Sequence, residues 1–344
     1  MLTLHTLDWN TAYAGRAERM RASEIRELLK LLDQPDIISF AGGTPDPALF
    51  PVQAASEAYA RILSSTEGPQ SLQYSVSEGY RPLREWIAAH MARLGVPCGV
   101  DNIVITSGSQ QGLDFLGKLL IGPGDTALVA APTYLGALQA FNAYEPRYDV
   151  FHVDGQGGGM RAEAHLRCAQ AAQSRLALAY AVPDFANTTG ETMGEVARLA
   201  LLDLAAELGI PLIEDAAYAQ LRFEGGPQRA LQVLDVERCG HIDRSRVIYC
   251  GTFSKTVSPG MRLGWVCASQ ELAQKIVLTK QSGDLHTATL NQMVLEAIVR
   301  DGYAAQVERI TAVYAKRRDA MLAALERHMP EGVRWTRPQG GMFV

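Results

Sequence analysis

Short apolar runs alternate with helical patterns through the middle of this chain. Runs of a length suited to buried strands, many of them rich in β-branched residues, occupy residues 103–106, 126–131, 175–182, 210–214 and 247–250. Apolar residues recur at helical spacing over residues 110–120, 136–144 and 194–208. This order predicts an α/β fold with a largely parallel sheet and helices on both faces. Ligands of such sheets bind at the carboxyl ends of the strands.

The pattern changes toward the C-terminus, where two long helices are predicted over residues 289–301 and 303–328 with no strand between them. We therefore expect a domain boundary near residues 285–290. The expected organisation is an N-terminal segment (1–45) that contributes to a small domain, a large domain (46–287), and an interdomain helix with the incomplete small domain (288–344). The glycines at positions 155, 157, 158 and 159 resemble a hairpin turn, and Met160 argues against a dinucleotide-binding loop.

Composition narrows the class of protein. Apolar residues make up 47% and charged residues 20% of the 344 residues, as in an ordinary globular enzyme. The net charge of −5 argues against nucleic acid as a partner, because binding a phosphate backbone needs a cationic surface. The five cysteines form no C-x-x-C pair, and no run of eighteen apolar residues occurs. We expect a cytoplasmic protein with reduced thiols and assign no metal ligands.

The stretch 251–265, GTFSKTVSPGMRLGW, places Lys255 among small hydroxyl residues and glycines, seven positions before Arg262. A Schiff base with pyridoxal phosphate needs a weakly hydrated amine, a cation for the phosphate, and a backbone that can approach a cofactor closely. Strands predicted on either side would deliver Lys255 to a loop at the sheet edge. A solvated loop lysine is the alternative, and the whole stretch favours the Schiff base.

A second element, residues 105–112, joins a strand that ends in small residues to a helix start. Free backbone N–H groups and the positive end of the helix dipole suit a phosphate group there. Ser109 and Gln110 would donate to it, and Arg262 would supply the charge. Simple N-capping of the helix by Ser107 or Ser109 is the alternative.

A third element, residues 211–218, is a buried strand that ends in two carboxylates. A buried carboxylate beside the ring nitrogen of pyridoxal phosphate keeps that nitrogen protonated, and Asp215 is the candidate. Tyr218 could donate to the phenolic oxygen of the cofactor, and Asn187, which follows another strand, could share that oxygen. These residues could instead cap the next helix.

With these motifs, the chain resembles the fold-type I pyridoxal-phosphate aminotransferases of class I and II, and looks closest to the 2-aminoadipate/kynurenine aminotransferase branch. The resemblance covers residues 22–344. The motifs that carry it are SFAGGTP at 39–45, LQYS at 72–75, the loop at 107–112, APTY at 131–134 and the Lys255 stretch.

The resemblance implies a mostly parallel seven-stranded sheet with a smaller α+β domain, and a role for each motif residue. Lys255 would carry the cofactor and move the substrate proton between Cα and C4′. Tyr134 would stack on the cofactor ring, Asn187 and Tyr218 would bind its oxygen, and Asp215 its nitrogen. The phosphate would be held by Ser109, Gln110, Thr252, Ser254 and Arg262.

It further implies a homodimer, because Tyr74 in this family reaches the partner subunit's site. Without the resemblance, Tyr74 and Tyr134 would be interpreted as core aromatics. Arg26 would meet the distal carboxylate of a dicarboxylic substrate, although an ordinary charge on an amphipathic helix fits equally well. Gly43 and Asn187 would complete the substrate contacts.

The sequence departs from the family in two places. Thr188 follows Asn187 where the family usually has proline, so we expect a trans peptide bond there. Residues 340–344 would lie in the first strand of the small domain, and the arginine that binds the substrate α-carboxylate in this family lies beyond them. If the protein ends at Val344, we expect cofactor binding with weakened turnover.

The function that the resemblance implies is transfer of an amino group between an L-amino acid of 2-aminoadipate, aromatic or branched type and 2-oxoglutarate, in a ping-pong cycle. Two alternatives use the same cofactor constellation. One is a regulator-like or catalytically impaired pyridoxal-phosphate-binding protein, and the other is a pyridoxal-phosphate-dependent C–S lyase.

Overall fold

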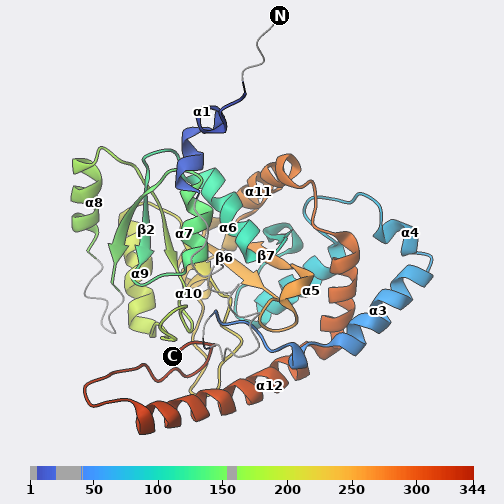
Figure 1. Ribbon diagram of the computed structural model, residues 1–344. Coiled ribbons are helices and arrows are strands. Elements are labelled where there is room, and N and C mark those ends of the chain that lie inside the picture. The colour runs from blue at the N-terminus through green and yellow to red at the C-terminus, as the bar shows by residue number, and fades with distance from the viewer. Residues whose placement is uncertain (1–5, 21–39, 41, 153–160) are drawn as a thin grey trace, which may run out of the picture.

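A computed structural model describes residues 6–20, 40, 42–152 and 161–344 of the chain. Its centre is one seven-stranded sheet in the order β1-β7-β6-β5-β4-β2-β3 (Figure 1). The strands are β1 Ile103–Thr106, β2 Thr126–Ala130, β3 Arg147–Phe151, β4 Leu176–Ala181, β5 Leu212–Asp215, β6 Val247–Thr252 and β7 Gly264–Cys267. β7 runs antiparallel to both of its neighbours, whereas all other pairs are parallel. The predicted mostly parallel sheet is therefore confirmed.

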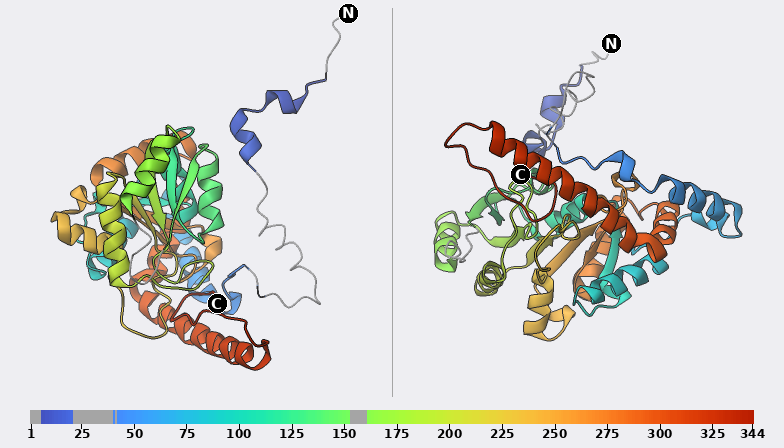
Figure 2. Two further views of the ribbon diagram at one scale, coloured as in Figure 1. Left: turned by 90° about the vertical axis from the view of Figure 1, so that its left-hand side faces the viewer. Right: turned by 90° about the horizontal axis from the view of Figure 1, so that it is seen from below.

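Helices cover both faces of this sheet (Figures 1 and 2). The α-helices of the described residues are α1 Trp9–Ala12, α3 Val52–Ser64, α4 Gly68–Ser71, α5 Arg81–Arg93, α6 Ser109–Leu120, α7 Leu135–Asn142, α8 Ala162–Ala171, α9 Glu195–Glu207, α10 Leu231–Cys239, α11 Gln270–Gly283 and α12 Thr289–His328. Single turns of 3₁₀-helix occur at Pro47–Leu49, Val100–Asn102, Ile242–Arg244 and Pro259–Met261, and a longer one at Gly15–Arg19. None of the helices in the described ranges combines the length and apolarity needed to cross a membrane.

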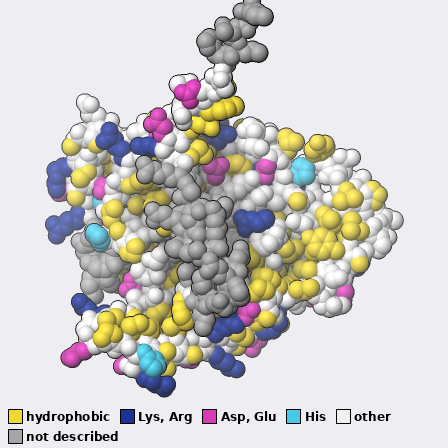
Figure 3. Space-filling view, viewed as in Figure 1, with side chains coloured by type: hydrophobic (Ala, Val, Ile, Leu, Met, Phe, Trp, Pro, Cys, Tyr) yellow, Lys and Arg dark blue, Asp and Glu magenta, His cyan; other side chains and the backbone are white. Residues whose placement is uncertain are grey.

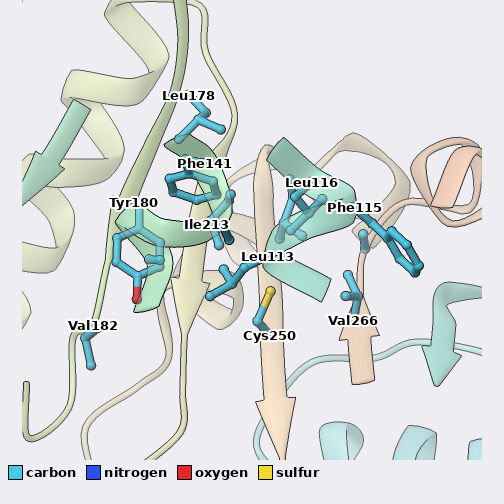
Figure 4. Close-up of a cluster of buried hydrophobic side chains, with 14 of the residues drawn as sticks. Leu113, Phe115, Leu116, Phe141, Leu178, Tyr180, Val182, Ile213, Cys250 and Val266 are labelled. Carbon is cyan, nitrogen blue, oxygen red and sulfur yellow. The ribbon is translucent and has the colours of Figure 1, made fainter. Parts of the chain in front are cut away.

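The strand sequence explains the two covered faces. Leu178 and Tyr180 of β4 point into one apolar cluster, whereas Ala179 and Ala181 point into another, because side chains alternate along a strand. The first cluster lies under α6, α7 and α11. Figure 4 shows its members Leu113, Leu116 and Phe141. Burying each large apolar side chain contributes about 1.5–3 kcal/mol. This packing fixes the strand ends that carry the site.

One predicted boundary is wrong. The sequence predicted two helices, over 289–301 and 303–328, and the structure has the single helix α12, Thr289–His328. A glycine inside a helix costs about 1 kcal/mol relative to alanine. At Gly302 this cost is offset by packing, because the Tyr303 ring lies 5.0 Å from the Trp86 ring and 5.5 Å from the His90 ring, and Val299 is buried.

The segment at 340–344 also differs from the expectation. These residues form no strand, and a single β-bridge joins Gly340 to Arg222. The backbone nitrogen of Gly341 donates to the oxygen of Leu221 at 2.8 Å, and the Phe343 ring lies edge-on to Tyr218 at 5.5 Å. The predicted hairpin at 155–159 lies outside the described residues. The β-strand β3, which the sequence analysis missed, is an exposed edge strand with only Phe151 buried.

Candidate active site

A cavity of about 190 Å³ opens at the carboxyl ends of β4, β5 and β6, beside the start of α6. It is lined by Gly42, Ser109, Gln110, Tyr134, Val182, Asn187, Asp215, Ala217, Tyr218, Thr252, Ser254, Lys255, Pro259 and Arg262. Every residue predicted to bind the cofactor is in this set except Tyr74. The segments that supply them are far apart in sequence, and the parallel strands bring them to one edge of the sheet.

Lys255 follows β6 and points into the cavity, with its side chain half-buried. Its Nζ donates to the backbone oxygen of Gly43 at 3.5 Å and lies 5.8 Å from the centre of the Tyr218 ring. Burial lowers the pKa of Lys255, and the positive charge of Arg262 lowers it further. A larger share of the amine is therefore neutral, which is the nucleophilic form.

Asp215 ends β5 and is 3% exposed. Its Oδ2 accepts a 2.8 Å hydrogen bond from the hydroxyl of Tyr180, while Oδ1 is buried and has no hydrogen-bond partner among the described residues. Burial raises the pKa of Asp215 to about 6, against the opposing effects of the Tyr180 hydrogen bond, the backbone N–H of Ala217 and the Lys255 charge. An unpaired buried carboxylate oxygen is costly, so Oδ1 has an unused capacity to accept a donor in the cavity.

Tyr180 is a residue that the sequence analysis missed. It is fully buried on β4, opposite Ile213 of β5, and so shares a face of the sheet with Asp215 two positions on. The signal was present once the strands were placed in parallel register, because residues i and i+2 of a strand lie on the same face.

The loop before α6 and the loop before β7 form a tight cradle. Gly108 has φ of +83°, and a Cβ placed on it would lie 2.5 Å from Nη2 of Arg262. A Cβ on Gly264 would lie 2.7 Å from the backbone nitrogen of Ser109. Arg262 donates from Nη2 to the oxygen of Ser107 at 3.3 Å. The first backbone N–H groups of α6 and the Arg262 guanidinium therefore lie at one end of the cavity, where they suit an anion.

The two helix-capping alternatives are resolved differently. The N-cap of α6 is Gly108, with no side-chain cap, so neither Ser107 nor Ser109 plays that role. In contrast, Glu214 does cap a helix, because its carboxylate accepts from the backbone nitrogens of Leu231 and Gln232 at the start of α10, both at 2.9 Å. Asp215, the next residue, points to the opposite face and lines the cavity.

Hydrogen bonds hold the remaining side chains of the cavity. Nε2 of Gln110 donates to the oxygen of Gly136 at 2.6 Å, and the Tyr134 hydroxyl donates to Oε1 of Gln110 at 3.4 Å. Nδ2 of Asn187 donates to the hydroxyl oxygen of Tyr218 at 3.5 Å. The peptide bond between Asn187 and Thr188 is trans, as expected. Among the described residues, the one cis peptide bond joins Ala131 to Pro132.

Tyr74 is not in this cavity. Its side chain is 79% exposed and its ring meets His286 edge-on at 6.0 Å, so the interpretation of Tyr74 as a core aromatic is wrong. Gly43 lies beside the cavity through its contact with Lys255. Arg26 lies outside the described residues.

Comparison with known proteins places this geometry in a family. The sequence model of the family described as aminotransferase class I and II matches residues 35–344.

The chain belongs to the class I and II aminotransferases.

Relatives of this aminotransferase are similar over most of their length. It is 42% identical to aromatic-amino-acid aminotransferase 1 of Thermococcus litoralis, over 98% of this chain and 80% of the relative. The 2-aminoadipate transaminase of Thermus thermophilus is also 42% identical, over 98% of this chain and 82% of its own length. Among solved structures, the Pyrococcus horikoshii kynurenine aminotransferase, in complex with PMP, has a TM-score of 0.87 at 42% identity, covering 97% of this chain and 81% of its own.

A second solved structure connects the fold to the cofactor. The Thermus thermophilus α-aminoadipate aminotransferase, in complex with N-(5′-phosphopyridoxyl)-L-leucine, has a TM-score of 0.86 at 40% identity, covering 97% of this chain and 81% of its own. This aminotransferase has the fold of the fold-type I pyridoxal-phosphate enzymes and depends on pyridoxal phosphate, near the aminoadipate/kynurenine branch of the family.

The cavity of this aminotransferase has the donor set that pyridoxal phosphate requires. The unpaired Oδ1 of Asp215 suits a protonated ring nitrogen, the glycine-lined cradle with Arg262 suits a phosphate, and the Lys255 amine suits the aldehyde. Because these groups lie around one cavity, they can engage a single small molecule together.

Proposed function

We propose that this aminotransferase moves an amino group between an L-amino acid of 2-aminoadipate, aromatic or branched type and 2-oxoglutarate, in a ping-pong cycle. The observation that carries the proposal is the pairing, in one cavity, of the Lys255 amine with the unpaired Asp215 carboxylate oxygen. Relatives named for 2-aminoadipate, aromatic amino acids and kynurenine support the donor class. One shared cavity supports the ping-pong order, because donor and acceptor would use it in turn.

Each side chain has a role that follows from its position. Pyridoxal phosphate, when bound, supplies an electron sink for the negative charge that develops at the substrate α-carbon. Lys255 would attach the cofactor, and its amine, whose pKa is lowered, would move a proton between the substrate α-carbon and C4′ of the cofactor. Asp215 holds a proton on the ring nitrogen through Oδ1. Tyr134 packs against the ring, and Asn187 and Tyr218 bind its oxygen.

The phosphate and the substrate have separate contacts in this scheme. The phosphate is held by the start of α6 and the loops around Lys255, through Ser109, Gln110, Thr252, Ser254 and Arg262. The substrate meets Gly43, Asn187 and Arg26. Support for Gly43 is its position within hydrogen-bonding distance of Lys255 Nζ.

The three-part organisation of the chain also belongs to this proposal. Residues 46–287 form the large cofactor-binding domain, and residues 1–45 and 288–344 contribute to the small domain. Its support is that α12 runs along the outside of the molecule, away from the sheet, for most of its length (Figures 1 and 2). A cytoplasmic location accompanies a small-molecule metabolic activity.

A homodimer with shared active sites completes the proposal. Apolar side chains are exposed near Tyr74: Leu72 is 71%, Val76 57% and Leu285 51% exposed. The space-filling view shows apolar side chains gathered on the side of α3 and α4 (Figure 3). An apolar patch of this kind favours contact with another protein surface, and a second copy would carry Tyr74 to the partner's cavity.

Mixed dimers test the sharing of sites. Tyr74→Ala and Lys255→Ala homodimers are each expected to be inactive or nearly so. When the two are co-refolded in equal amounts, half of the dimers are mixed and each mixed dimer holds one native site, so activity should return to about a quarter of the wild-type value. No gain over the sum of the two parents would show that Tyr74 acts within its own chain.

A panel of amino acids tests the reaction itself. Each L-amino acid is added to the purified protein, and the absorbance of the bound cofactor is followed. We expect conversion to pyridoxamine phosphate with a dicarboxylic or aromatic donor, and reversal on adding 2-oxoglutarate. Release of ammonia and a keto acid without any acceptor would instead identify a lyase and overturn the proposal.

A further inference from the structure

Lys280 on α11 is fully buried and its charge is held by a compact hydrogen-bond network. Its Nζ donates to Oε1 of Gln111 at 3.1 Å, to both carboxylate oxygens of Asp284 at 2.9 Å, and to Oγ1 of Thr287 at 2.9 Å. Gln111 also donates from Nε2 to the Asp284 carboxylate at 2.7 Å. None of these four residues lines the cofactor cavity, so the assigned chemistry leaves the network unexplained.

The network holds the loop that begins the phosphate cradle. Oε1 of Gln111 accepts from the backbone nitrogen of Ser107 at 2.8 Å, and the Ser107 hydroxyl lies 3.4 Å from both Asp284 Oδ2 and Thr287 Oγ1. Arg262 holds the same residue on its other side, through the Ser107 oxygen. Ser107 is thus fixed from two directions, immediately before Gly108 and Ser109.

Stability alone is a poor explanation for such a network. Replacing a buried ion pair by apolar groups of similar volume is often neutral or stabilising, because desolvating the two charges offsets their attraction. Fixed direction is a better explanation, because a phosphate site gains affinity only when its donors are held in place before the ligand arrives.

We propose that Lys280 is a positioning residue for the cofactor phosphate: it holds Gln111, Asp284 and Thr287 so that the loop at 107–109 keeps its donors aimed at the phosphate. This inference rests on the proposed placement of the phosphate at Ser109, Gln110 and Arg262. The network should therefore affect affinity for the phosphate group and leave the rest of the cofactor site unchanged.

The test compares pyridoxal phosphate with pyridoxal, which lacks the phosphate, on the apoprotein. We expect Lys280→Met to raise the Kd for pyridoxal phosphate about tenfold, the loss of one well-aligned charge-assisted hydrogen bond. The Kd for pyridoxal should change less than about twofold. Free pyridoxal forms a cyclic hemiacetal, which weakens its binding by the same factor in every variant. The informative quantity is therefore the ratio of the Kd for pyridoxal to the Kd for pyridoxal phosphate.

Two further variants make the comparison decisive. The double variant Lys280→Met/Asp284→Leu removes both charges while keeping apolar volume, and we expect it to fold with a thermal midpoint near that of the wild type and the same loss of phosphate preference. Lys275→Met, on an exposed lysine of the same helix, is the matched control and should change neither constant.

Each result has one meaning. An unchanged ratio in a folded variant, or an equal weakening of both ligands, would overturn the role of Lys280. Arg262→Leu tests the underlying assignment separately, because it should reduce the preference for the phosphorylated ligand whatever Lys280 does. If Arg262→Leu keeps the full preference, the phosphate site has been placed wrongly.

Discussion

Lys255→Ala is expected to abolish covalent attachment of pyridoxal phosphate and to lower kcat by about 10⁴-fold or more. The reason is that, in the proposed function, one amine serves both as the attachment point and as the group that moves the substrate proton. Other lysines do not line the cavity among the described residues, so no neighbour can replace it. The measurement is borohydride reduction followed by peptide mass spectrometry, with single-turnover kinetics for the rate.

Two controls separate loss of the amine from loss of the site. Lys255→Arg keeps a positive charge but cannot form the covalent bond, so it should be as inactive as the alanine variant. Lys316→Ala, on an exposed lysine of α12, should keep wild-type attachment and rate. Reducible attachment that persists in Lys255→Ala at full stoichiometry would assign the cofactor to another lysine.

Asp215→Asn is expected to have opposite effects on activity and on apoprotein stability. Loss of the carboxylate removes the proposed partner of the ring nitrogen. A ring-nitrogen pKa lowered by about three units corresponds to a decrease of about 10³-fold in kcat. The apoprotein should gain about 1–3 kcal/mol in the free energy of unfolding at pH 8. It gains because burial raises the pKa of Asp215 to about 6, so the ionised side chain opposes folding at that pH.

The pH dependence of this gain follows from the direction of the shift. The folded protein holds the Asp215 proton more tightly than the unfolded chain, whose carboxyl has a pKa of 3.8. The cost of ionising Asp215 is therefore absent below about pH 4, grows between about pH 4 and pH 6, and is constant above that. Urea unfolding of the two apoproteins at pH 8 and pH 5 should show a smaller difference at pH 5.

Tyr180→Phe is the matched variant, because it keeps the carboxylate and removes its hydrogen-bond donor. The pKa of Asp215 should rise further, and the apoprotein should lose about 1–2 kcal/mol at pH 8. Activity should fall about tenfold, with its acid limb moved to higher pH. If Asp215→Asn and Tyr180→Phe shift apoprotein stability at pH 8 in the same direction, the buried-charge account of Asp215 is wrong.

Local sequence signals predicted several of the residues that line the cavity, among them Lys255, Asp215 and Arg262. Some features can be recognised within about ten residues of sequence. The glycines at 108 and 264 reflect a backbone conformation. The apolar strands that end at Asp215 and before Lys255 reflect strand burial and the placement of a polar residue after a strand. The continuous helix through Gly302 was missed because the packing of Tyr303 on Trp86 and His90 comes from residues more than 200 positions away.

The sequence by itself determined the parallel α/β architecture and which residues could meet a pyridine ring, a phosphate and an aldehyde, because strand and helix periodicity and residue chemistry are local properties. Only the tertiary structure decided that Tyr180 holds Asp215 and that Lys280 supports Ser107. Each of these contacts joins elements that are distant in sequence. Which buried polar groups meet, and which oxygen remains unpaired, depends on strand register and helix packing, and these are set by the folded chain as a whole.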